Sequence, residues 1–588
     1  MPDPGPYVDH RLAYRRRRSR LVQVGEVPVG GLAPIAVQSM CTTPTQDVAA
    51  TVAQCVRLAE AGCQIVRVTA PGVKDAQALK AIRAGLSAAG FRATPLVADI
   101  HFMPAAALEA IEHVEKVRIN PGNYADKKRL AARDYSDLEY AAELEHVATR
   151  FRPLVRRARE LGRSLRIGTN HGSLSDRIMN RFGDSPAGMV ESALEFIVIA
   201  EAEGFRDLII SMKASNPKIM VAAYRLLCAR LRAHGTEYPL HLGVTEAGDG
   251  EDGRIKSAAG IGALLEDGLG DTIRVSLTEP PECEIPVAQA LVARYAAWRG
   301  HPAPPAVPAE SVDPYVYRRR ASGSVRLGGV AVGGGQEIKV AAAGASVGLP
   351  PADLLLGGGQ VPLGGLRPGE AVPAQAVVLL DLDDQDPGRG LREALALLPE
   401  GVCVGLAGVG TLGETRAYRL LAAVLGESGR QHPICLALPL VSDDLAAAAI
   451  SGGLLIDGLG DLLYLPAVAD PRRLAFTILQ AVKARLTRAD YVACPSCGRT
   501  QFDLFEVTAH IRERTAHLDG VSIAIMGCIV NGPGEMADAH FGFVGSGKGK
   551  VDLYRGKEVV RRNLPFASGR DELILLIKEA GLWKDPPG

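Results

Sequence analysis

Short runs of β-branched and apolar residues alternate with longer stretches of Leu, Ala and Ile at helical spacing between Pro34 and Trp298. This alternation is typical of repeated βα units, in which each strand is followed by a helix. Eight such strands predict an α/β fold with a closed (β/α)8 TIM barrel, although a doubly wound parallel sheet produces the same pattern and stays open as the alternative. The predicted strands cover residues 35–39, 64–69, 95–99, 116–120, 164–169, 207–211, 240–244 and 271–276.

A proline-rich segment, HPAPPAVPAESVDP, follows the last predicted barrel helix. Clustered prolines stiffen and expose a chain, as expected of a linker between domains. Beyond it, Gly, Ala and Leu dominate up to about residue 485, with strand-like runs at 375–382 and 434–440. We therefore predict three domains, which are a TIM barrel at 1–299, an inserted domain at 300–485, and a smaller α/β domain at 486–588.

One stretch of the inserted region repeats the end of the predicted barrel. GALLEDGLGDTIRV at 262–275 recurs in altered form as GGLLIDGLGDLLYL at 452–465. Such self-similarity indicates a diverged copy of the barrel's final turn or more, and chance similarity between Gly- and Leu-rich segments is the alternative. Because the inserted region offers mainly Gly and Ala where the barrel strands end in polar residues, we predict that it is a barrel-like scaffold.

The composition indicates a folded globular protein and argues against some classes of partner. The 588 residues are 47% hydrophobic and 22% charged, which is typical of a folded globular chain. Lys plus Arg (66) equals Asp plus Glu (66), so no global basic field attracts nucleic acid or anionic lipid. Since the chain has neither an apolar run of 18 residues nor a recognisable secretory signal, we expect a cytoplasmic location. Ten cysteines in such a chain indicate reduced thiols, with the functional ones used for metal or redox chemistry.

Three cysteines near the C-terminus form the strongest chemical signal. Cys494 and Cys497 stand in a CxxC motif, and Cys528 follows the apolar run VSIAIM at the start of a glycine-rich loop. A CxxC turn lets two sulfurs converge on one ion or cluster, so the three thiolates predict a metal centre. A zinc ribbon completed by His510 or His517 is the alternative, and it would leave the NGPGE loop unexplained.

A carboxylate accompanies the three thiols, because Glu535 ends the motif MGCIVNGPGE. Three soft thiolates and one hard carboxylate suit a four-iron cluster in which one iron keeps an exchangeable oxygen ligand that a substrate oxygen could replace. An ordinary surface acid is the competing interpretation of Glu535.

Polar residues end all but the first of the predicted barrel strands. Catalytic groups of TIM barrels gather at these carboxyl ends, so we expect the side chains to meet at one mouth. Four arginines and a lysine would repel one another in a partly dry site unless an anion lay among them, and guanidinium groups match phosphate oxygens. The alternative is that each arginine pairs with a neighbouring acid. The residues are Arg67 with Thr69, Asp99 with His101, Arg118 with Asn120, Arg166 with Asn170, Ser211 with Lys213, Glu246, and Arg274 with Ser276.

These motifs together resemble those of the hydroxymethylbutenyl diphosphate synthase family, also called IspG or GcpE. The resemblance covers roughly residues 20–300 and 486–565, and the inserted region resembles the extra domain of the family's three-domain members. The barrel motifs are QSMCTT, VRVTAP, ADIHF, KVRINPGN, RIGTNHGSL, SMKASN, HLGVTEAG and IRVSLT, and the cluster motifs are ACPSCGR and MGCIVNGPGE.

The resemblance implies an iron–sulfur oxidoreductase of isoprenoid biosynthesis that takes methylerythritol cyclodiphosphate as its substrate at the barrel mouth. Glu246 and Glu535 would be catalytic, with Glu246 as the proton donor. The diphosphate would lie near Arg67, Arg118, Arg166, Lys213, Arg274 and Ser276. The remaining substrate contacts implied are Asp99, His101, Asn120, Asn170, Glu246 and Asn531.

The resemblance also implies a 4Fe-4S cluster bound by Cys494, Cys497, Cys528 and Glu535 in a small domain resembling those of sulfite and nitrite reductases. Reduced ferredoxin or flavodoxin would supply two electrons, one at a time. For the cluster to reach the substrate, the C-terminal domain has to close over the barrel, and we predict that the inserted domain lets one chain do this as a functional monomer.

Two other functions stay open from the residues alone. The cysteine spacing is compatible with a zinc-containing nucleic-acid binder, against which the balanced charge argues. The cationic mouth is compatible with a phosphate-binding barrel hydrolase whose cluster is purely structural.

Overall fold

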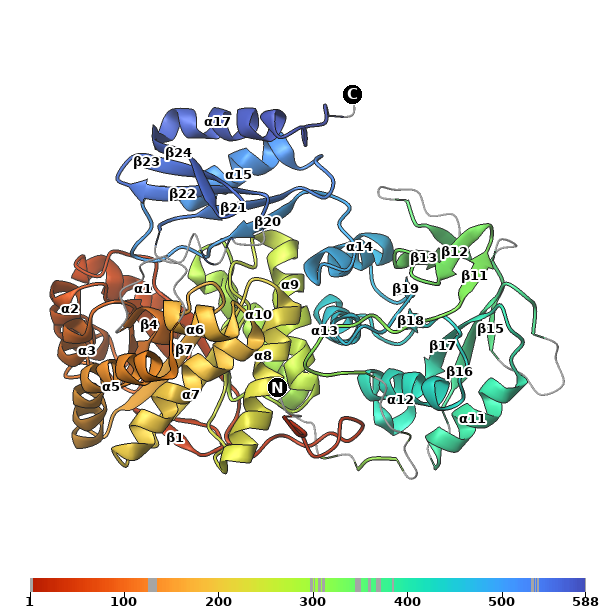
Figure 1. Cartoon of the computed structure of the whole chain (residues 1–588), viewed down its shortest axis with the longest axis horizontal. Helices are drawn as coiled ribbons and strands as arrows, with labels where there is room; N and C mark the ends of the chain where they lie inside the picture. Colours follow the sequence, from red (N-terminus) through yellow and green to blue (C-terminus); the bar gives the residue numbers. More distant parts are fainter. Residues whose placement is uncertain are drawn as a thin grey trace.

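The computed structural model describes residues 4–124, 135–296, 300, 302–304, 308, 312–343, 351–357, 361–365, 372–382, 385–529, 534, 536 and 539–586. In Figure 1 the N-terminal barrel, in red to yellow-green, carries the blue C-terminal part on one end and the green-cyan inserted part at its side. No helix of the described residues is both long and apolar enough to cross a lipid bilayer.

Eight parallel strands in the described part of the chain form the barrel in the order β8-β7-β6-β5-β4-β3-β10-β9. A parallel bridge between Ile210 and Leu240 joins β8 to β9 and closes the ring. The predicted TIM barrel is therefore confirmed, and the doubly wound alternative is excluded. The strands are β3 (Ala36–Met40), β4 (Ile65–Thr69), β5 (Leu96–Ile100), β6 (Lys116–Ile119), β7 (Ser164–Asn170), β8 (Leu208–Lys213), β9 (His241–Leu242) and β10 (Thr272–Ile273).

The barrel helices begin where the sequence supplies capping side chains. Asp47, Ser175 and Asn216, for example, each accept a hydrogen bond from a backbone N–H of the first turn of the helix that follows. The helices are α1 (Val48–Glu60), α2 (Val73–Ala88), α3 (Pro104–Ala110), α4 (Pro121–Tyr124), α5 (Asp137–Glu160), α6 (Asp176–Phe182), α7 (Pro186–Ala202), α8 (Pro217–His234), α9 (Gly250–Glu266) and α10 (Glu284–Ala296).

The inside of the barrel is apolar at one end and polar at the other. A hairpin of β1 (Val22–Val24) and β2 (Val27–Val29) packs on Ile65 and Val97, and this cluster plugs the amino end. Two residues further along the same strands stand Arg67 and Asp99. Because side chains alternate along a strand, residues two apart share a face, so the strands carry polar groups towards the carboxyl end.

The inserted part is also a ring of parallel strands. Among the described residues, sheets β14-β13-β19-β18 and β15-β16-β17 are linked by bridges Leu356–Val361 and Val404–Ile434. The strands are β13 (Lys339–Ala343), β14 (Leu354–Leu356), β15 (Leu363–Gly365), β16 (Val377–Asp381), β17 (Cys403–Gly408), β18 (Cys435–Ala437) and β19 (Leu462–Tyr464). Its helices are α11 (Pro387–Leu397), α12 (Glu414–Glu427), α13 (Asp444–Ile456) and α14 (Pro471–Ala481).

The two rings contain equivalent hydrogen bonds, in each of which an aspartate accepts from a serine hydroxyl and from a backbone N–H. In the barrel, Ser19 Oγ donates to Asp271 Oδ1 at 2.9 Å, and Leu240 N donates to Asp271 Oδ2 at 2.8 Å. In the insertion, Ser322 Oγ and Ile434 N donate to the two oxygens of Asp461, each at 3.0 Å. A hairpin of β11 (Ser324–Leu327) and β12 (Val330–Gly333) follows Ser322 as β1 and β2 follow Ser19. The repeat seen at 262–275 and 452–465 therefore extends to the hairpins that precede both rings.

Helices α9 and α13 pack against each other and join the two rings. A Cβ at Gly262 would lie against Ala449, and a Cβ at Gly452 would lie against Ala259, so the two backbones approach closely. Glycine is required at both positions because even a methyl group would separate the helices.

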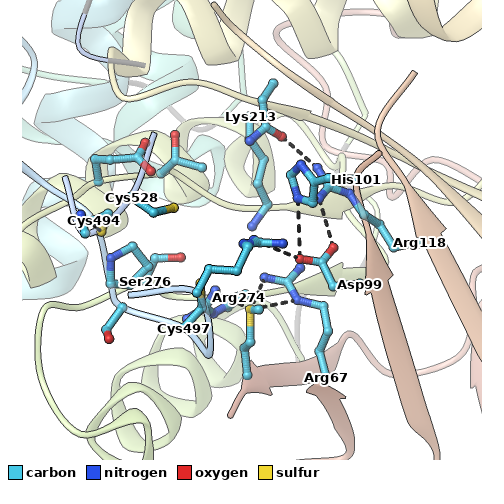
Figure 2. A pocket seen from close by; sticks show the side chains of 18 of the residues that line it. Arg67, Asp99, His101, Arg118, Lys213, Arg274, Ser276, Cys494, Cys497 and Cys528 are labelled. Carbon is cyan, nitrogen blue, oxygen red and sulfur yellow. Dashed lines mark hydrogen bonds and ion pairs between the residues drawn. The ribbon is translucent and has the colours of Figure 1, made fainter. Parts of the chain in front are cut away.

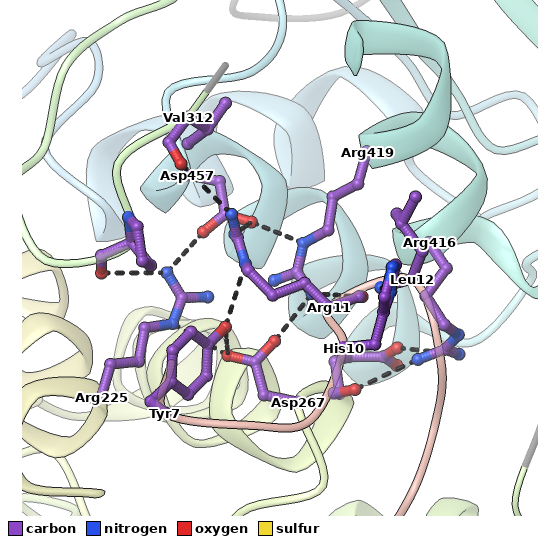
Figure 3. Close-up of polar contacts among 12 residues, drawn as sticks. Tyr7, His10, Arg11, Leu12, Arg225, Asp267, Val312, Arg416, Arg419 and Asp457 are labelled. Atoms are coloured by element: carbon purple, nitrogen blue, oxygen red, sulfur yellow. Dashed lines mark hydrogen bonds and ion pairs between the residues drawn. The ribbon is translucent and has the colours of Figure 1, made fainter. Parts of the chain in front are cut away.

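A cluster of buried charges, which includes Arg11, lies beside the contact between α9 and α13 (Figure 3). Arg225 donates to Asp267 Oδ2 at 2.9 Å and to Asp457 Oδ1 at 2.6 Å. Arg419 binds the remaining oxygens of the same two carboxylates, each at 2.8 Å. Asp267 and Asp457 stand at matching positions of the repeat, so one such pair from each ring forms the cluster.

The C-terminal part is a five-stranded sheet in the order β20-β21-β22-β23-β24, within the described residues. The first three strands are parallel, so the carboxyl ends of β20 and β21, which precede the cysteines, lie at one edge. The elements are β20 (Asp490–Ala493), α15 (Leu504–Thr515), β21 (Ser522–Met526), β22 (Phe541–Gly547), β23 (Lys550–Arg555), β24 (Glu558–Pro565) and α17 (Phe566–Glu579).

Candidate active site between the barrel and the C-terminal sheet

One cavity is lined by residues from both the barrel mouth and the cysteine loops (Figure 2). In Figure 2 Cys494 and Cys528 lie on one side of it, Arg67, Arg118 and His101 lie on the other, and the side chains of Arg274 and Lys213 lie between them. The barrel contributes Met40, Arg67, Asp99, His101, Arg118, Arg166, Asn170, Lys213, Thr245, Glu246, Arg274 and Ser276. The C-terminal part contributes Cys494, Pro495, Ser496, Cys497, Arg499, Met526, Gly527 and Cys528.

Arg118 organises one wall of the cavity. Its Nη1 donates to Asp99 Oδ1 at 2.9 Å and lies 2.5 Å from His101 Nε2, while its Nη2 donates to Asn170 Oδ1 at 3.0 Å. Burial alone would raise the pKa of Asp99, but Arg118 and Arg67 outweigh it and hold that pKa well below its usual range. Burial, Arg499 and Arg118 lower the pKa of His101 to about 3, so its imidazole is neutral at physiological pH.

Arg67 and Arg274 converge on the thioether of Met40. Arg67 Nε and Nη2 lie 3.1 and 2.9 Å from Met40 Sδ, and Arg274 Nη1 lies 3.6 Å from the same sulfur. Arg274 is held by Glu284, whose two carboxylate oxygens accept from Nε at 3.1 Å and from Nη2 at 2.9 Å. Burial, together with the neighbouring Arg274 and Arg118, lowers the pKa of Arg67 to about 9 against the opposing effect of Asp99.

Positive charge exceeds negative charge around the cavity. The described lining residues include six cationic side chains, Arg67, Arg118, Arg166, Lys213, Arg274 and Arg499, and two carboxylates, Asp99 and Glu246. Burial and the surrounding arginines lower the pKa of Lys213 well below its usual value. Nε and Nη1 of Arg166 are buried and have no hydrogen-bond partner among the described residues. A cavity with surplus cations and unpaired donors suits a multiply charged anion such as a diphosphate.

Glu246 lies in the cavity wall with an unusual backbone. Its φ of 50° places it in the left-handed region, which costs free energy for a residue with a side chain. Its Oε2 is buried and has no hydrogen-bond partner among the described residues. Glu246 therefore lies in the cavity wall with one carboxylate oxygen that no described residue binds.

The three cysteines lie on the side of the cavity that the C-terminal part contributes. Cys494, Cys497 and Cys528 line one cavity, and Cys494 Sγ accepts a hydrogen bond from Gly527 N at 3.3 Å. Among the described residues, no three His, Cys, Asp or Glu side chains lie close enough to hold one ion. His517 also lies apart, because its Nε2 is 2.7 Å from the carbonyl oxygen of Lys584.

Not every predicted site residue lines the cavity. Asn120 is fully buried, but its Oδ1 accepts a hydrogen bond from Gly122 N at 3.2 Å and it is not among the lining residues. Asn531 and Glu535 lie outside the described residues. Thr69 and Ser211 are also buried and do not line the cavity, whereas the other predicted barrel residues and the three cysteines do.

Sequence reasoning missed several residues of the site, among them Met40, Glu284 and Arg499. Met40 ends the first barrel strand, the one strand for which no polar terminal residue was identified. Glu284 begins α10 and reaches Arg274 from behind the cavity. Arg499 stands inside the motif ACPSCGR, but it is neither a cysteine nor the end of a predicted strand, so neither pattern marked it.

Comparison with known proteins agrees with this architecture. Residues 19–289 match the GcpE TIM-barrel domain, and residues 490–579 match the GcpE protein C-terminal domain. Among solved structures, a dihydropteroate synthase from Xanthomonas albilineans covers 47% of the chain and 98% of its own at 16% identity and a TM-score of 0.31, which is too low to support an inference.

Near full-length relatives carry one name. The chain is 48% identical to the 4-hydroxy-3-methylbut-2-en-1-yl diphosphate synthase (flavodoxin) of Akkermansia muciniphila, over 99% of both chains. It is 44% identical to the enzyme of the same name from Leptospira interrogans, over 98% of both. It is 43% identical to the chloroplastic 4-hydroxy-3-methylbut-2-en-1-yl diphosphate synthase (ferredoxin) of Oryza sativa, over 99% of this chain and 89% of that one. The chain therefore belongs to the GcpE family.

Proposed function

We propose that this chain is a 4-hydroxy-3-methylbut-2-enyl diphosphate synthase acting on methylerythritol cyclodiphosphate. Two electrons and two protons enter, a ring carbon–oxygen bond to phosphate breaks, and a substrate hydroxyl leaves as water to give hydroxymethylbutenyl diphosphate. One observation carries the proposal, which is that a strongly cationic barrel mouth and three cysteine thiols line a single cavity. The cationic mouth accounts for a diphosphate ligand, and the thiols account for reductive chemistry.

Cys494, Cys497 and Cys528, with the predicted fourth ligand Glu535, would hold a 4Fe-4S cluster. When bound, the cluster would supply electrons to the substrate one at a time, and reduced flavodoxin or ferredoxin would replenish them, as the names of the relatives suggest. Burial raises the pKa of the Cys494 thiol, so a thiolate at this position needs the positive charge of bound iron.

The barrel residues bind and orient the substrate in this proposal. Arg67, Arg118, Arg166, Lys213 and Arg274 neutralise the diphosphate, and Ser276 adds a hydroxyl donor. Because Arg67, Arg118 and Arg274 are already held in place by neighbouring side chains, they need little reorganisation when the anion binds. Asp99, His101 and Asn170 would complete the contacts with the rest of the substrate, together with the predicted Asn120 and Asn531.

Glu246 is the proton donor in this proposal. Its Oε2 is buried and without a partner among the described residues, and it lies in the wall that also carries the substrate-binding cations. A protonated carboxyl group there can give its proton to the departing hydroxyl, because water is the better leaving group.

A single chain supplies both halves of the cavity, which supports the functional monomer predicted from the sequence. The contact between α9 and α13 and the buried charges beside it hold the inserted part next to the barrel. We extend the proposal to a cytoplasmic enzyme that needs no partner subunit for turnover.

Anaerobic turnover tests the function directly. The full chain is purified without oxygen, its iron and acid-labile sulfide are measured, and methylerythritol cyclodiphosphate is supplied with reduced flavodoxin or a strong chemical reductant. We expect about four irons per chain and formation of hydroxymethylbutenyl diphosphate. Iron-loaded protein that releases phosphate from the substrate without consuming reductant would instead establish a hydrolase with a structural cluster.

A further inference from the structure

Arg499 is the one charged side chain that the described C-terminal residues contribute to the cavity. It follows Cys497 by two positions, and its side chain is only 12% exposed. Its Nη2 lies 3.6 Å from Asp99 Oδ2 of the barrel. Arg499 therefore bridges the loop that carries two cysteines and the barrel wall that carries the predicted substrate contacts.

The ion pair with Asp99 does not use the whole guanidinium group. The guanidinium group also interacts with the Cys497 thiol, but its Nε and Nη1 are buried and have no hydrogen-bond partner among the described residues. Asp99 already accepts a shorter hydrogen bond from Arg118, at 2.9 Å. A desolvated cation with two unused donors is costly to bury, so its place at the cavity wall indicates a ligand that completes it.

The surrounding backbone also limits how the loop can be placed. A Cβ at Gly498 would lie 2.8 Å from Thr43 O and 2.9 Å from Thr69 Oγ1, so the loop before Arg499 already contacts the barrel closely. Arg499 is thus delivered to the cavity only when the loop lies against the ends of β3 and β4.

We propose that Arg499 is a positioning residue that binds the substrate's diphosphate from the C-terminal side and so couples substrate binding to closure of the cysteine loop over the barrel. The inference rests on the proposed function, because it takes the ligand to be a diphosphate ester. Without ligand, the contact with Asp99 holds the loop loosely. With ligand, the two unused donors meet phosphate oxygens, and binding free energy draws the thiols towards the substrate.

The chain offers a matched control. Arg512 also crosses from the C-terminal part to the barrel, and its Nη2 lies 2.9 Å from Asp249 Oδ1 and 3.4 Å from Asp252 Oδ2. It is 29% exposed and does not line the cavity. Arg512→Gln therefore removes an interdomain ion pair without removing a cavity donor.

The test compares wild type, Arg499→Gln, Arg499→Lys and Arg512→Gln as iron-loaded full chains without reductant, so that the substrate binds but does not react. Substrate affinity is measured by calorimetry, and hydrogen exchange of residues 494–503 is measured with and without substrate. For Arg499→Gln we expect unchanged iron content, about 10- to 100-fold weaker substrate binding, as for loss of charge-assisted hydrogen bonds, and no ligand-induced protection of the loop. Arg499→Lys should recover part of both effects, and Arg512→Gln should keep both.

Three results would overturn the proposal. They are an Arg499→Gln variant that binds substrate as tightly as wild type, one whose loop is still protected on binding, and one that has lost its iron. If Arg499→Gln does not fold, Arg499→Ala takes its place under the same criteria. Inorganic diphosphate serves as a second probe. Loop protection by diphosphate in wild type but not in Arg499→Gln would support the coupling. Failure to turn over methylerythritol cyclodiphosphate would refute the proposed function and leave this result standing.

Discussion

Gly172 of the barrel and Gly534 of the C-terminal part lie backbone against backbone. A Cβ on Gly534 would overlap the carbonyl group of Gly172, and a Cβ on Gly172 would overlap the backbone of Gly534. Gly172 stands two residues beyond β7, on the same turn that carries Asn170 into the cavity. The C-terminal part, which carries the three cysteines and is called the cysteine module below, can approach the barrel this closely only because both residues lack a side chain.

Gly534→Ala should separate the two modules without disturbing either one. Gly534 is not at positive φ, so alanine suits its backbone, and the added methyl group acts only on the contact with Gly172. We expect turnover to fall by about 100-fold, as for a displacement of roughly 1 Å in a catalytic geometry, with iron content retained. Gly547→Ala is the control, because a Cβ at Gly547 would meet nothing within 4 Å. Equal activity of the two variants would show that close approach is not required.

Replacement of Glu246 by Gln should separate chemistry from binding. The amide keeps the shape of the side chain but cannot donate an acid proton, so we expect kcat to fall by roughly 10²- to 10⁴-fold. The absorption spectrum of the cluster and the dissociation constant of the substrate should remain close to those of wild type. Unchanged kcat in anaerobic assays would remove Glu246 from the role of proton donor.

Asp457→Asn should destabilise the contact between barrel and insertion. The change leaves Arg225 and Arg419 buried with one carboxylate where there were two, and breaking such a buried pair costs about 3–5 kcal/mol. Thermal unfolding should therefore begin at a lower temperature, while folded protein at low temperature keeps its substrate affinity because the cavity is not touched. Asp444→Asn serves as the control, since Asp444 lies on α13 outside the charge cluster. An unchanged unfolding profile would contradict a stabilising role for the cluster.

The same aspartate predicts a pH dependence. Burial alone would raise the pKa of Asp457, but Arg225, Arg419 and Arg11 outweigh it and lower that pKa. A carboxyl group whose pKa is lower in the folded state stabilises the fold above its unfolded value of about 3.9 and loses this effect as the pH falls. The difference in melting temperature between wild type and Asp457→Asn should thus be large at pH 7 and shrink below about pH 4. An iron–sulfur cluster that is lost in acid would be lost from both proteins, so the comparison between their melting temperatures still holds.

Catalysis within one chain can be tested by complementation. Lys213→Gln removes a cation of the barrel mouth, and Cys528→Ser removes a thiol of the cysteine loops, so each variant should be inactive alone. A mixture of the two should stay inactive if each chain closes on its own barrel. Recovered turnover in the mixture, together with a dimer in analytical ultracentrifugation, would show that the modules work between chains.

The barrel and most of its lining could be predicted because strand periodicity also marks where strands end. Arg67, Asp99 and Lys213 stand at such ends, and the closed ring brings them together. Asn120 also ends a predicted strand, but local hydrogen bonding with Gly122 takes up its side-chain oxygen, which periodicity does not encode.

Arg499 and Glu284 could not be found in the same way, because a loop and a helix start carry them into the site from outside the strand pattern. Neither hairpin was predicted, because strands of three or four residues are too short to show a period; the equivalent contacts of Ser19 and Ser322 show that the two hairpins correspond. The domain boundaries, the four ligands of the cluster and the kinship of the C-terminal sheet to sulfite and nitrite reductases stay predictions.

The valine hairpin at the amino end of the barrel has a consequence for the catalytic cycle. Val22, Val24 and Val29 are fully buried against the strand starts, which leaves no passage through the barrel axis at that end among the described residues. Reactant and product must then use the gap between barrel and cysteine module for both arrival and departure. Each turnover would include a separation of the barrel from the cysteine module. The rate of that separation would then set an upper limit on kcat even if bond breaking were fast.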